Sequence, residues 1–188
     1  MNTSPANLII LAHPSPKSLR ASLAQAYARG CNGQVLSLNE LDFVWNLDPR
    51  EVPALEPELV RAQALIKEAK HITWVYPCWW GSAPACLKAF VDRTFITGYA
   101  YRYKPNGMPE GLLKGKTSRI LLTMDSPSWW HALVYRKSAL TWLRWATLWF
   151  SGIKVLQPKL FAGVRKASPE QIQRWLAEAS SLGKQDAR

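Results

Sequence analysis

The stretch Val75-Tyr76-Pro77-Cys78-Trp79-Trp80-Gly81-Ser82-Ala83-Pro84 joins an apolar strand to a helix. Residues 71–76 are mostly β-branched or aromatic, which favours a strand. Apolar side chains across 87–95 recur at roughly helical spacing, so we expect Ser82 as the N-cap and Pro84 in the first helical turn. Ligands bind at loops that follow strands in open α/β sheets. The paired tryptophans therefore indicate either a flat ligand or a hydrophobic loop that covers the end of the sheet.

The composition predicts one domain over residues 1–188, because the chain is long enough for a sizeable core and 48% of its residues are apolar. The apolar run at 8–12 is too short for a signal sequence or a membrane span. The three cysteines lack zinc-type spacing, so we expect no metal site. These features predict a cytoplasmic protein.

The net charge of +11 is compatible with nucleic acid, an anionic membrane or anionic small molecules. No zinc-finger or RNA-recognition signature is present, and the basic residues are scattered. We therefore expect no nucleic-acid partner. The phosphates of a cofactor would account for part of the charge.

Five apolar segments have the composition of strands and alternate with helical patterns. They cover residues 8–12, 34–38, 71–76 and 118–124, with a fifth at 153–156 and 159–161. The alternation predicts an α/β fold with helices on both faces of a parallel sheet, in the order 2-1-3-4-5. Residues 168–171 form a capping box for a final helix. The polar tail at 183–188 is expected to fray.

A loop rich in serine and proline follows the first strand, and Ser18 is the expected N-cap of the next helix. Free N–H groups and the helix dipole at such a turn attract an anion. An ordinary capped helix explains the same residues. The fourth strand leads to Asp125-Ser126-Pro127, where we expect Asp125 to cap the following helix. Residues 99–116 are expected to form a loop or a short hairpin.

Five tryptophans lie between residues 129 and 149. Trp142, Trp145 and Trp149 are three and four residues apart, so a helix would place them on one face. Three interpretations stay open for this segment. It contributes core and a subunit interface, it is a cationic tryptophan-rich face for a membrane surface, or part of it lines a pocket for a flat apolar substrate.

The segment 76–101 resembles the signature of the flavodoxin-like NAD(P)H:quinone oxidoreductases. It carries Tyr-Pro-Cys-Trp-Trp-Gly, then Pro84, Leu-Lys-Ala-Phe, Asp-Arg-Thr-Phe and a closing Gly-Tyr-Ala-Tyr. Ala12-His13 followed by Ser18 resembles the first motif of that family, and residues 39–54 resemble its long excursion after the second strand. The resemblance implies a flavodoxin-like three-layer fold, a flavin, NAD(P)H as co-substrate, a quinone-like acceptor and a homodimer.

The resemblance also implies three groups of site residues. The flavin phosphate would contact His13, Ser18, Leu19, Arg20 and Ser22. The flavin ring would contact Pro77, Cys78, Trp79, Trp80 and Gly81, and its polar edge would lie near Asp125, Ser126 and Pro127. Trp80 would also wall the catalytic pocket. The family's Tyr and His relay has no direct equivalent, since Leu133 and Ala139 fall at those positions, and Tyr135 and His131 are the nearby substitutes.

FMN is favoured over FAD because the chain lacks the long C-terminal extension of relatives. The sequence leaves the acceptor and the choice between NADH and NADPH open. One branch of the family attaches to glutathione-gated potassium efflux systems, so a regulatory subunit docked at a membrane partner is the alternative function. A flavodoxin-type electron carrier is disfavoured because such carriers are usually acidic.

Overall fold

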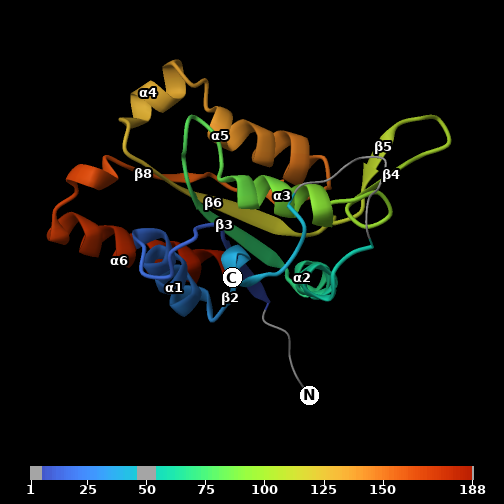
Figure 1. Ribbon diagram of the computed structural model, residues 1–188, viewed down its shortest axis with the longest axis horizontal. Helices are drawn as coiled ribbons and strands as arrows, with labels where there is room; N and C mark the ends of the chain where they lie inside the picture. The colour runs from blue at the N-terminus through green and yellow to red at the C-terminus, as the bar shows by residue number, and fades with distance from the viewer. Residues whose placement is uncertain (1–5, 46–53, 188) are drawn as a thin grey trace.

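A computed structural model of the protein describes residues 6–45 and 54–187. Its core is a parallel sheet (Figure 1) of β1 (Asn7–Leu11), β2 (Gln34–Ser37), β3 (His71–Pro77), β6 (Thr117–Met124), β7 (Lys154–Val155) and β8 (Lys159–Ala162). The strand order is β2-β1-β3-β6-β7, and β8 also pairs with β6. Two short strands therefore share the fifth position of the sheet. β7 pairs with Thr117 and Ser118 of β6, and β8 pairs with residues 121–124 of β6. The predicted order 2-1-3-4-5 is confirmed.

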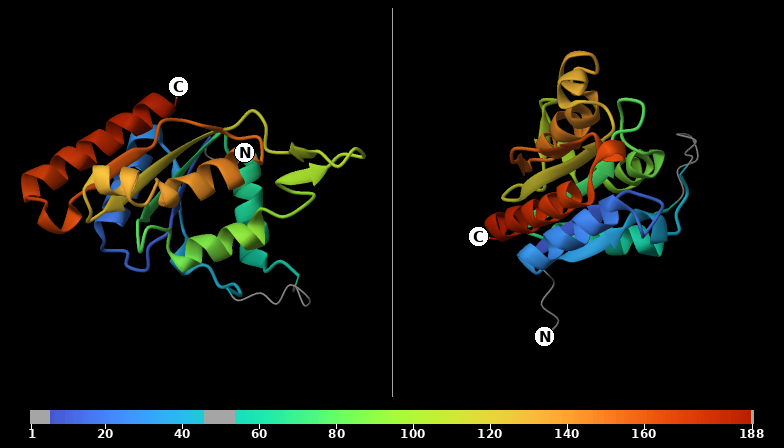
Figure 2. Two further views of the ribbon diagram at one scale, coloured as in Figure 1. Left: turned by 90° about the horizontal axis from the view of Figure 1, so that it is seen from above. Right: turned by 90° about the vertical axis from the view of Figure 1, so that its left-hand side faces the viewer.

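Helices cover both faces of this sheet (Figures 1 and 2). One face packs against α1 (Leu19–Cys31) and α6 (Pro169–Asp186), and the other against α2 (Pro57–Glu68), α3 (Ala85–Thr94), α5 (Ser138–Thr141) and the π-helix η2 (Trp142–Trp149). Alternate strand residues supply the two cores: Ile9 and Leu11 face α1, whereas Leu8 and Ile10 belong to the other cluster. Both faces are apolar, as buried parallel strands require.

The remaining elements are short. They are η1 (Leu38–Glu40), the antiparallel pair β4 (Tyr101–Tyr103) and β5 (Pro109–Gly111), α4 (Ser128–Leu133) and η3 (Val164–Lys166). The pair β4 and β5 is the short hairpin expected within residues 99–116. Residues 46–53 of the predicted excursion lie outside the described residues. No helix in the described ranges is long and apolar enough to cross a membrane.

Two of the three predicted N-cap residues are confirmed, and the third is wrong. The hydroxyls of Ser18 and Ser168 accept hydrogen bonds from the N–H groups of Ala21 and Gln171, which confirms both N-caps. Ser82, however, does not cap α3, because its backbone pairs with Trp79 in a tight turn. Pro84 takes the N-cap position and α3 begins at Ala85.

The expected fraying of the C-terminal tail is wrong. Helix α6 continues to Asp186, whose side chain is only 4% exposed and binds Arg119 and Tyr27. A close approach between helices makes this possible. A Cβ added to Gly183 would lie 2.3 Å from the Tyr27 carbonyl oxygen, so only glycine allows α6 to pack this closely on α1.

The tryptophan-rich segment forms three consecutive helical pieces, α4, α5 and η2. Leu140, Leu143 and Leu148 are buried, so the segment does supply core. The prediction of one shared tryptophan face is wrong for Trp142, which packs against the core while Trp145 and Trp149 are 50% and 63% exposed. The wider turn of a π-helix changes the angular spacing that an α-helix would give these residues.

Candidate functional site

Three of the predicted loops meet at the carboxyl edge of the sheet, because β1, β3 and β6 are neighbours in it. Backbone hydrogen bonds continue the pairing past the strand ends. Ala12 N–H donates to the Val75 carbonyl at 2.9 Å, and Cys78 N–H donates to the Thr123 carbonyl at 2.7 Å. The residues from His13, from Pro77 and from Asp125 onward therefore leave the sheet side by side.

The middle loop is a tight turn with Trp80 at its tip. Trp79 and Ser82 exchange backbone hydrogen bonds at 2.9 Å, and the two residues between them have positive φ, 51° at Trp80 and 73° at Gly81. Positive φ at both central positions defines a type I′ turn, in which a large side chain is unfavourable. Trp80 is nevertheless there and is 100% exposed. The turn thus holds a strained, fully exposed aromatic side chain at the carboxyl edge of the sheet.

The first loop brings an imidazole and the start of α1 to the same edge. The His13 and Trp79 rings lie 5.8 Å apart. Nδ1 of His13 lies 3.1 Å from the Ser15 amide nitrogen and 3.2 Å from the Ser15 carbonyl oxygen, so it accepts from the first or donates to the second according to the tautomer of the ring. Burial lowers the pKa of His13, the Ser15 contact opposes that change, and the charge of Arg20 lowers the pKa further. His13 is therefore mainly neutral at neutral pH.

Arg20 reaches across the crevice from α1 to the end of β6. Its Nε donates to Thr123 Oγ1 at 2.7 Å. Burial lowers the pKa of the Arg20 guanidinium, and the Asp125 carboxylate opposes this change. Thr123 was missed as a site residue because it reads as one more β-branched residue of the strand, yet it binds both Arg20 and Cys78.

Asp125 does not cap α4, contrary to expectation. The N-cap of α4 is Pro127, and the Asp125 carboxylate instead accepts hydrogen bonds from the backbone N–H (2.9 Å) and guanidinium (3.3 Å) of Arg165 in η3. Arg165 was also missed, since no local pattern connects it with a residue 40 positions earlier. Ser126 is half-buried and Pro127 is exposed beside this pair.

The two predicted relay residues, Tyr135 and His131, differ in their surroundings. The Tyr135 ring lies under the Trp80 turn, because a Cβ built on Gly81 would be 3.4 Å from Tyr135 Cγ. The Ser138 hydroxyl donates to the Gly81 carbonyl and fixes the turn on this side. His131 is 1% exposed, and its two ring nitrogens have no partner within the described chain. Burial lowers the pKa of His131, as does the charge of Lys137.

The remaining predicted residues complete the crevice. Cys78 is half-buried, and burial raises the pKa of its thiol while a hydrogen bond from the Gly81 backbone opposes that shift, so it is a neutral side chain at pH 7. Pro77 is buried and Leu19 is half-buried. Ser22 is exposed on the first turn of α1, and its hydroxyl contacts the Ser18 carbonyl.

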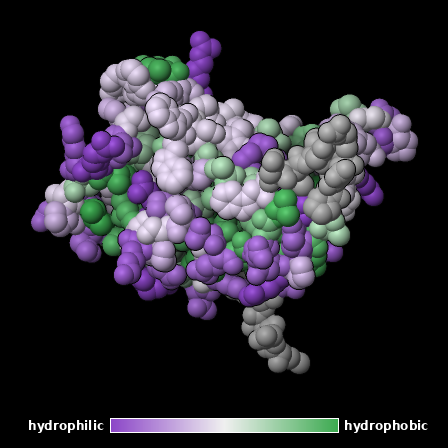
Figure 3. Space-filling view, in the orientation of Figure 1, coloured by the Kyte–Doolittle hydropathy of each residue, from purple (hydrophilic) through white to green (hydrophobic). Residues whose placement is uncertain are grey.

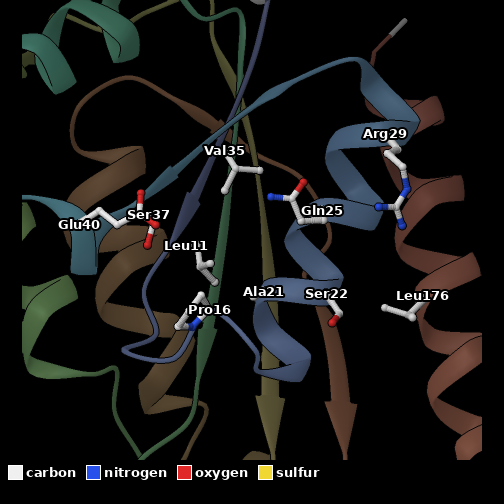
Figure 4. A pocket seen from close by; sticks show the side chains of 10 residues that line it. All are labelled: Leu11, Pro16, Ala21, Ser22, Gln25, Arg29, Val35, Ser37, Glu40 and Leu176. Carbon is white, nitrogen blue, oxygen red and sulfur yellow. The ribbon is translucent and has the colours of Figure 1, made fainter.

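A cavity of about 410 Å³ lies along α1 (Figure 4). Its lining comes from β1, β2, η1, α1 and α6 and from Pro16 of the first loop, and Arg29 and Glu40 are its charged side chains. Ser22 is the only residue that it shares with the predicted site. Because Pro16, Ala21 and Ser22 also line it, the cavity adjoins the first loop and the first turn of α1.

Comparisons with known proteins agree with this architecture. A family model described as flavodoxin-like fold matches residues 6–182. Ribosyldihydronicotinamide dehydrogenase [quinone] from Mus musculus is 27% identical over 218 residues, covering 95% of this chain and 92% of the mouse protein.

Two solved structures share the fold. NAD(P)H:quinone oxidoreductase from Methanothermobacter marburgensis superposes with a TM-score of 0.80 at 22% identity, covering 95% of this chain and 94% of the other. An FMN-dependent NADH-azoreductase from Bacillus anthracis, solved in complex with FMN, has a TM-score of 0.76 at 20% identity and covers 97% and 99%. By its matched length, its strand order and its loop arrangement, this chain belongs to the flavodoxin-like fold family.

Proposed function

We propose that this protein is a flavin-dependent NAD(P)H oxidoreductase that reduces quinone-like acceptors. The observation that carries the proposal is the meeting of three loops, after β1, β3 and β6, around one crevice at the carboxyl edge of the sheet. The mouse relative named ribosyldihydronicotinamide dehydrogenase [quinone] matches 95% of this chain, and a protein named NAD(P)H oxidoreductase from Haemophilus influenzae matches 64% of it.

The α1 end of the crevice fits a phosphate. The first turn of α1 contains no acidic residue, and the N–H groups of Leu19 and Arg20 have no partner within the described ranges. The hydroxyls of Ser18 and Ser22 add donors, and the imidazole of His13 lies on the same loop. Donors without a competing carboxylate at a helix N-terminus suit a dianion.

The turn at 77–81 fits the edge of a flat ring. Its backbone is fixed by the Thr123, Ser82 and Ser138 contacts, so its exposed N–H and C=O groups keep one geometry. A bound flavin supplies the acceptance and release of hydride. The protein would position the ring with this turn and Ser126, Trp80 would wall the pocket, and the Tyr135 ring, which packs against Gly81, would bring its hydroxyl to this side of the site. We prefer Tyr135 to His131 as the proton-handling residue, because the His131 ring is buried.

We propose FMN as the flavin. The donor set at α1 accounts for one phosphate group, and a structural neighbour binds FMN according to its title. Flavin released by denaturing the purified protein identifies the cofactor by chromatography and mass. Recovery of FAD would overturn this choice without affecting the oxidoreductase proposal.

We further propose that the chain is a single cytoplasmic domain that works as a homodimer. A groove of about 750 Å³ between α3, the β4–β5 hairpin and η2 supports the dimer. Aromatic side chains of Phe95, Tyr101 and Phe150 line it, and the pair Lys88–Asp92 offers both charges to a symmetric copy. Light scattering after gel filtration measures the mass, and a monomer at micromolar concentration would contradict the dimer.

A visible absorption spectrum followed by anaerobic addition of NADPH or NADH tests the proposed function. We expect flavin bands near 375 and 450 nm, roughly the free-flavin positions, that bleach on mixing and return when a quinone is added. The faster donor identifies the nicotinamide preference. A protein that binds no supplied flavin would remove the crevice assignment, and a bound flavin that neither donor reduces would favour the regulatory or electron-carrier alternative.

A further inference from the structure

The segment from Ser126 to Pro169 contains no acidic residue. Its seven cationic residues are Arg136, Lys137, Arg144, Lys154, Lys159, Arg165 and Lys166. The segment also carries five of the ten tryptophans. Lys159 and Arg165 pair with Glu178 and Asp125 outside the segment. The other five cations and the five tryptophans make this part of the chain basic and aromatic.

Helices α4, α5 and η2 of this segment lie together on the upper side of the molecule in Figure 1 and face the viewer in the left panel of Figure 2. Pale and apolar surface predominates over α4 in Figure 3. The most exposed apolar side chains here are Leu133 (73%), Trp149 (63%) and Trp129 (57%). Such large apolar exposure is uncommon unless the surface is covered in the working protein.

Four residues at the η2 end form a compact group, here called the tryptophan cluster: Arg144, Trp145, Trp149 and Lys154. The two tryptophan rings lie edge to face at 6.2 Å, and the Arg144 guanidinium stacks 5.0 Å from the Trp145 ring centre. Together with Gly152, Ile153 and Val155 they line a cavity of about 470 Å³. A hollow with an apolar lining and cationic edges suits an amphiphile with a negative head.

The tryptophan cluster is separate from the flavin crevice. Lys154 pairs with Thr117 at the amino end of β6, whereas Thr123 and Asp125 lie at the carboxyl end. Six strand residues separate the two pairing positions, or about 20 Å. Substitutions in the cluster therefore leave the redox site in place.

Charge decides which partner covers this surface. In a symmetric dimer through this face, the cations of each copy would meet a surface whose segment carries cations and no carboxylate, so no ion pair within the segment would offset their repulsion. Single-stranded nucleic acid stacks on aromatic rings, but Leu133 and Val134 offer it no π-face. Anionic lipid matches all three features, since tryptophan lies at the headgroup level, Lys and Arg contact phosphates, and aliphatic side chains enter the acyl region.

We propose that the surface formed by α4, α5 and η2, with the tryptophan cluster at its η2 end, binds the surface of an anionic phospholipid membrane. Binding is peripheral and electrostatic in part, so it weakens with salt. Membrane binding requires neither flavin nor catalytic activity. This proposal is therefore tested independently of the proposed function.

Flotation with lipid vesicles tests the proposal on the full-length protein. We expect the protein to float with phosphatidylglycerol–phosphatidylcholine vesicles in 50 mM salt, to stay behind with pure phosphatidylcholine vesicles, and to dissociate in 500 mM salt. The double variant W145A/W149A is expected to bind about tenfold more weakly, and Lys154→Glu, which reverses one charge near the lipid, also about tenfold more weakly.

Matched controls come from exposed residues outside the segment. Trp45→Ala removes a 51% exposed tryptophan and Lys104→Glu reverses an exposed lysine before the hairpin tip, and both are expected to bind as the unmodified protein does. Unchanged thermal melting shows that each variant is folded. The proposal is overturned if neither cluster variant changes vesicle binding, if the protein ignores anionic vesicles, or if W145A/W149A instead converts a dimer to monomers or abolishes binding to single-stranded DNA.

Discussion

Trp80 is the residue at which backbone strain and exposure coincide. Its φ of 51° costs a non-glycine residue roughly 1–2 kcal/mol, and its side chain buries nothing in the isolated chain. Strain without a compensating contact is typical of a side chain kept for a ligand. The folded chain gains nothing from this tryptophan that a smaller residue would not supply.

Trp80→Asn is therefore expected to leave the free energy of unfolding of the flavin-free protein unchanged or to raise it by up to about 1 kcal/mol, because asparagine tolerates positive φ. The same variant is expected to lose affinity for flavin or acceptor. Urea unfolding and flavin titration measure the two effects. A loss of stability above about 1 kcal/mol would mean that Trp80 supports the fold instead.

Tyr135 and His131 differ in burial, because Tyr135 is partly exposed whereas His131 is buried. Removing the Tyr135 hydroxyl with Tyr135→Phe keeps the ring under Gly81 and is expected to slow flavin reduction by NAD(P)H by about 10²-fold, the usual size of a lost proton-handling group. His131→Leu replaces a buried ring without hydrogen bonds and is expected to leave the rate unchanged. Stopped-flow reduction at equal flavin content measures both, and the reverse ranking would assign the role to His131.

At the scale of elements, α1 and α6 provide a controlled test of the phosphate site. Each begins with a serine whose hydroxyl accepts a backbone N–H, at 3.2 Å for Ser18 and 3.3 Å for Ser168. Losing such a cap costs about 1 kcal/mol in either helix. Ser18→Ala and Ser168→Ala should therefore destabilise the protein equally, whereas only Ser18→Ala weakens flavin binding. Equal flavin affinity in the two variants would remove the Ser18 end of α1 from the site.

Local sequence patterns were sufficient for the elements whose structure is decided locally. The runs at 8–12 and 71–76 are apolar and β-branched, and Ser18 and Ser168 begin helices that have clear caps. Together with the family resemblance, these strand ends are sufficient to predict which loops form the candidate site.

Local sequence patterns do not predict contacts between residues that are far apart in the chain. Asp125 prefers Arg165 to the nearer helix, and Asp186 orders the tail by binding Arg119, 67 residues earlier. The backbone pairing of Trp79 with Ser82 moves the start of α3, and the π-helix redistributes the tryptophans. In each case the deciding partner lies outside the window in which periodicity is visible.

At the scale of the whole molecule, a buried polar cluster at the amino edge of the sheet links four elements. His71 is 2% exposed and contacts Tyr27, Thr73 and Thr117 at 2.7–3.1 Å, with Asp186 at 3.7 Å. Burial lowers the pKa of His71 to about 4, although Asp186 opposes the change and Arg119 favours it. Burial tends to raise the pKa of Asp186, but hydrogen bonds from Arg119 and Tyr27 outweigh it and the pKa is lowered.

These shifts predict acid sensitivity centred on His71. The unfolded chain takes up the His71 proton near pH 6.5, whereas the folded chain resists it until about pH 4. The free energy of unfolding therefore falls as the pH drops between these values, by about 2 kcal/mol from this residue at pH 5. Asp186 stays ionised throughout and adds its own loss only at lower pH. Urea unfolding of flavin-free protein at pH 7, 6 and 5 measures the decline.

His71→Gln is the matched variant, since glutamine keeps hydrogen-bonding groups but does not titrate. It is expected to be less stable than the unmodified protein at pH 7 yet to lose about 2 kcal/mol less between pH 7 and 5. Buried His131 shifts in the same direction and remains in both proteins, so it cancels from the difference. Parallel declines in the two proteins would place the acid sensitivity outside this cluster and leave Asp186 held by Arg119 and Tyr27 alone.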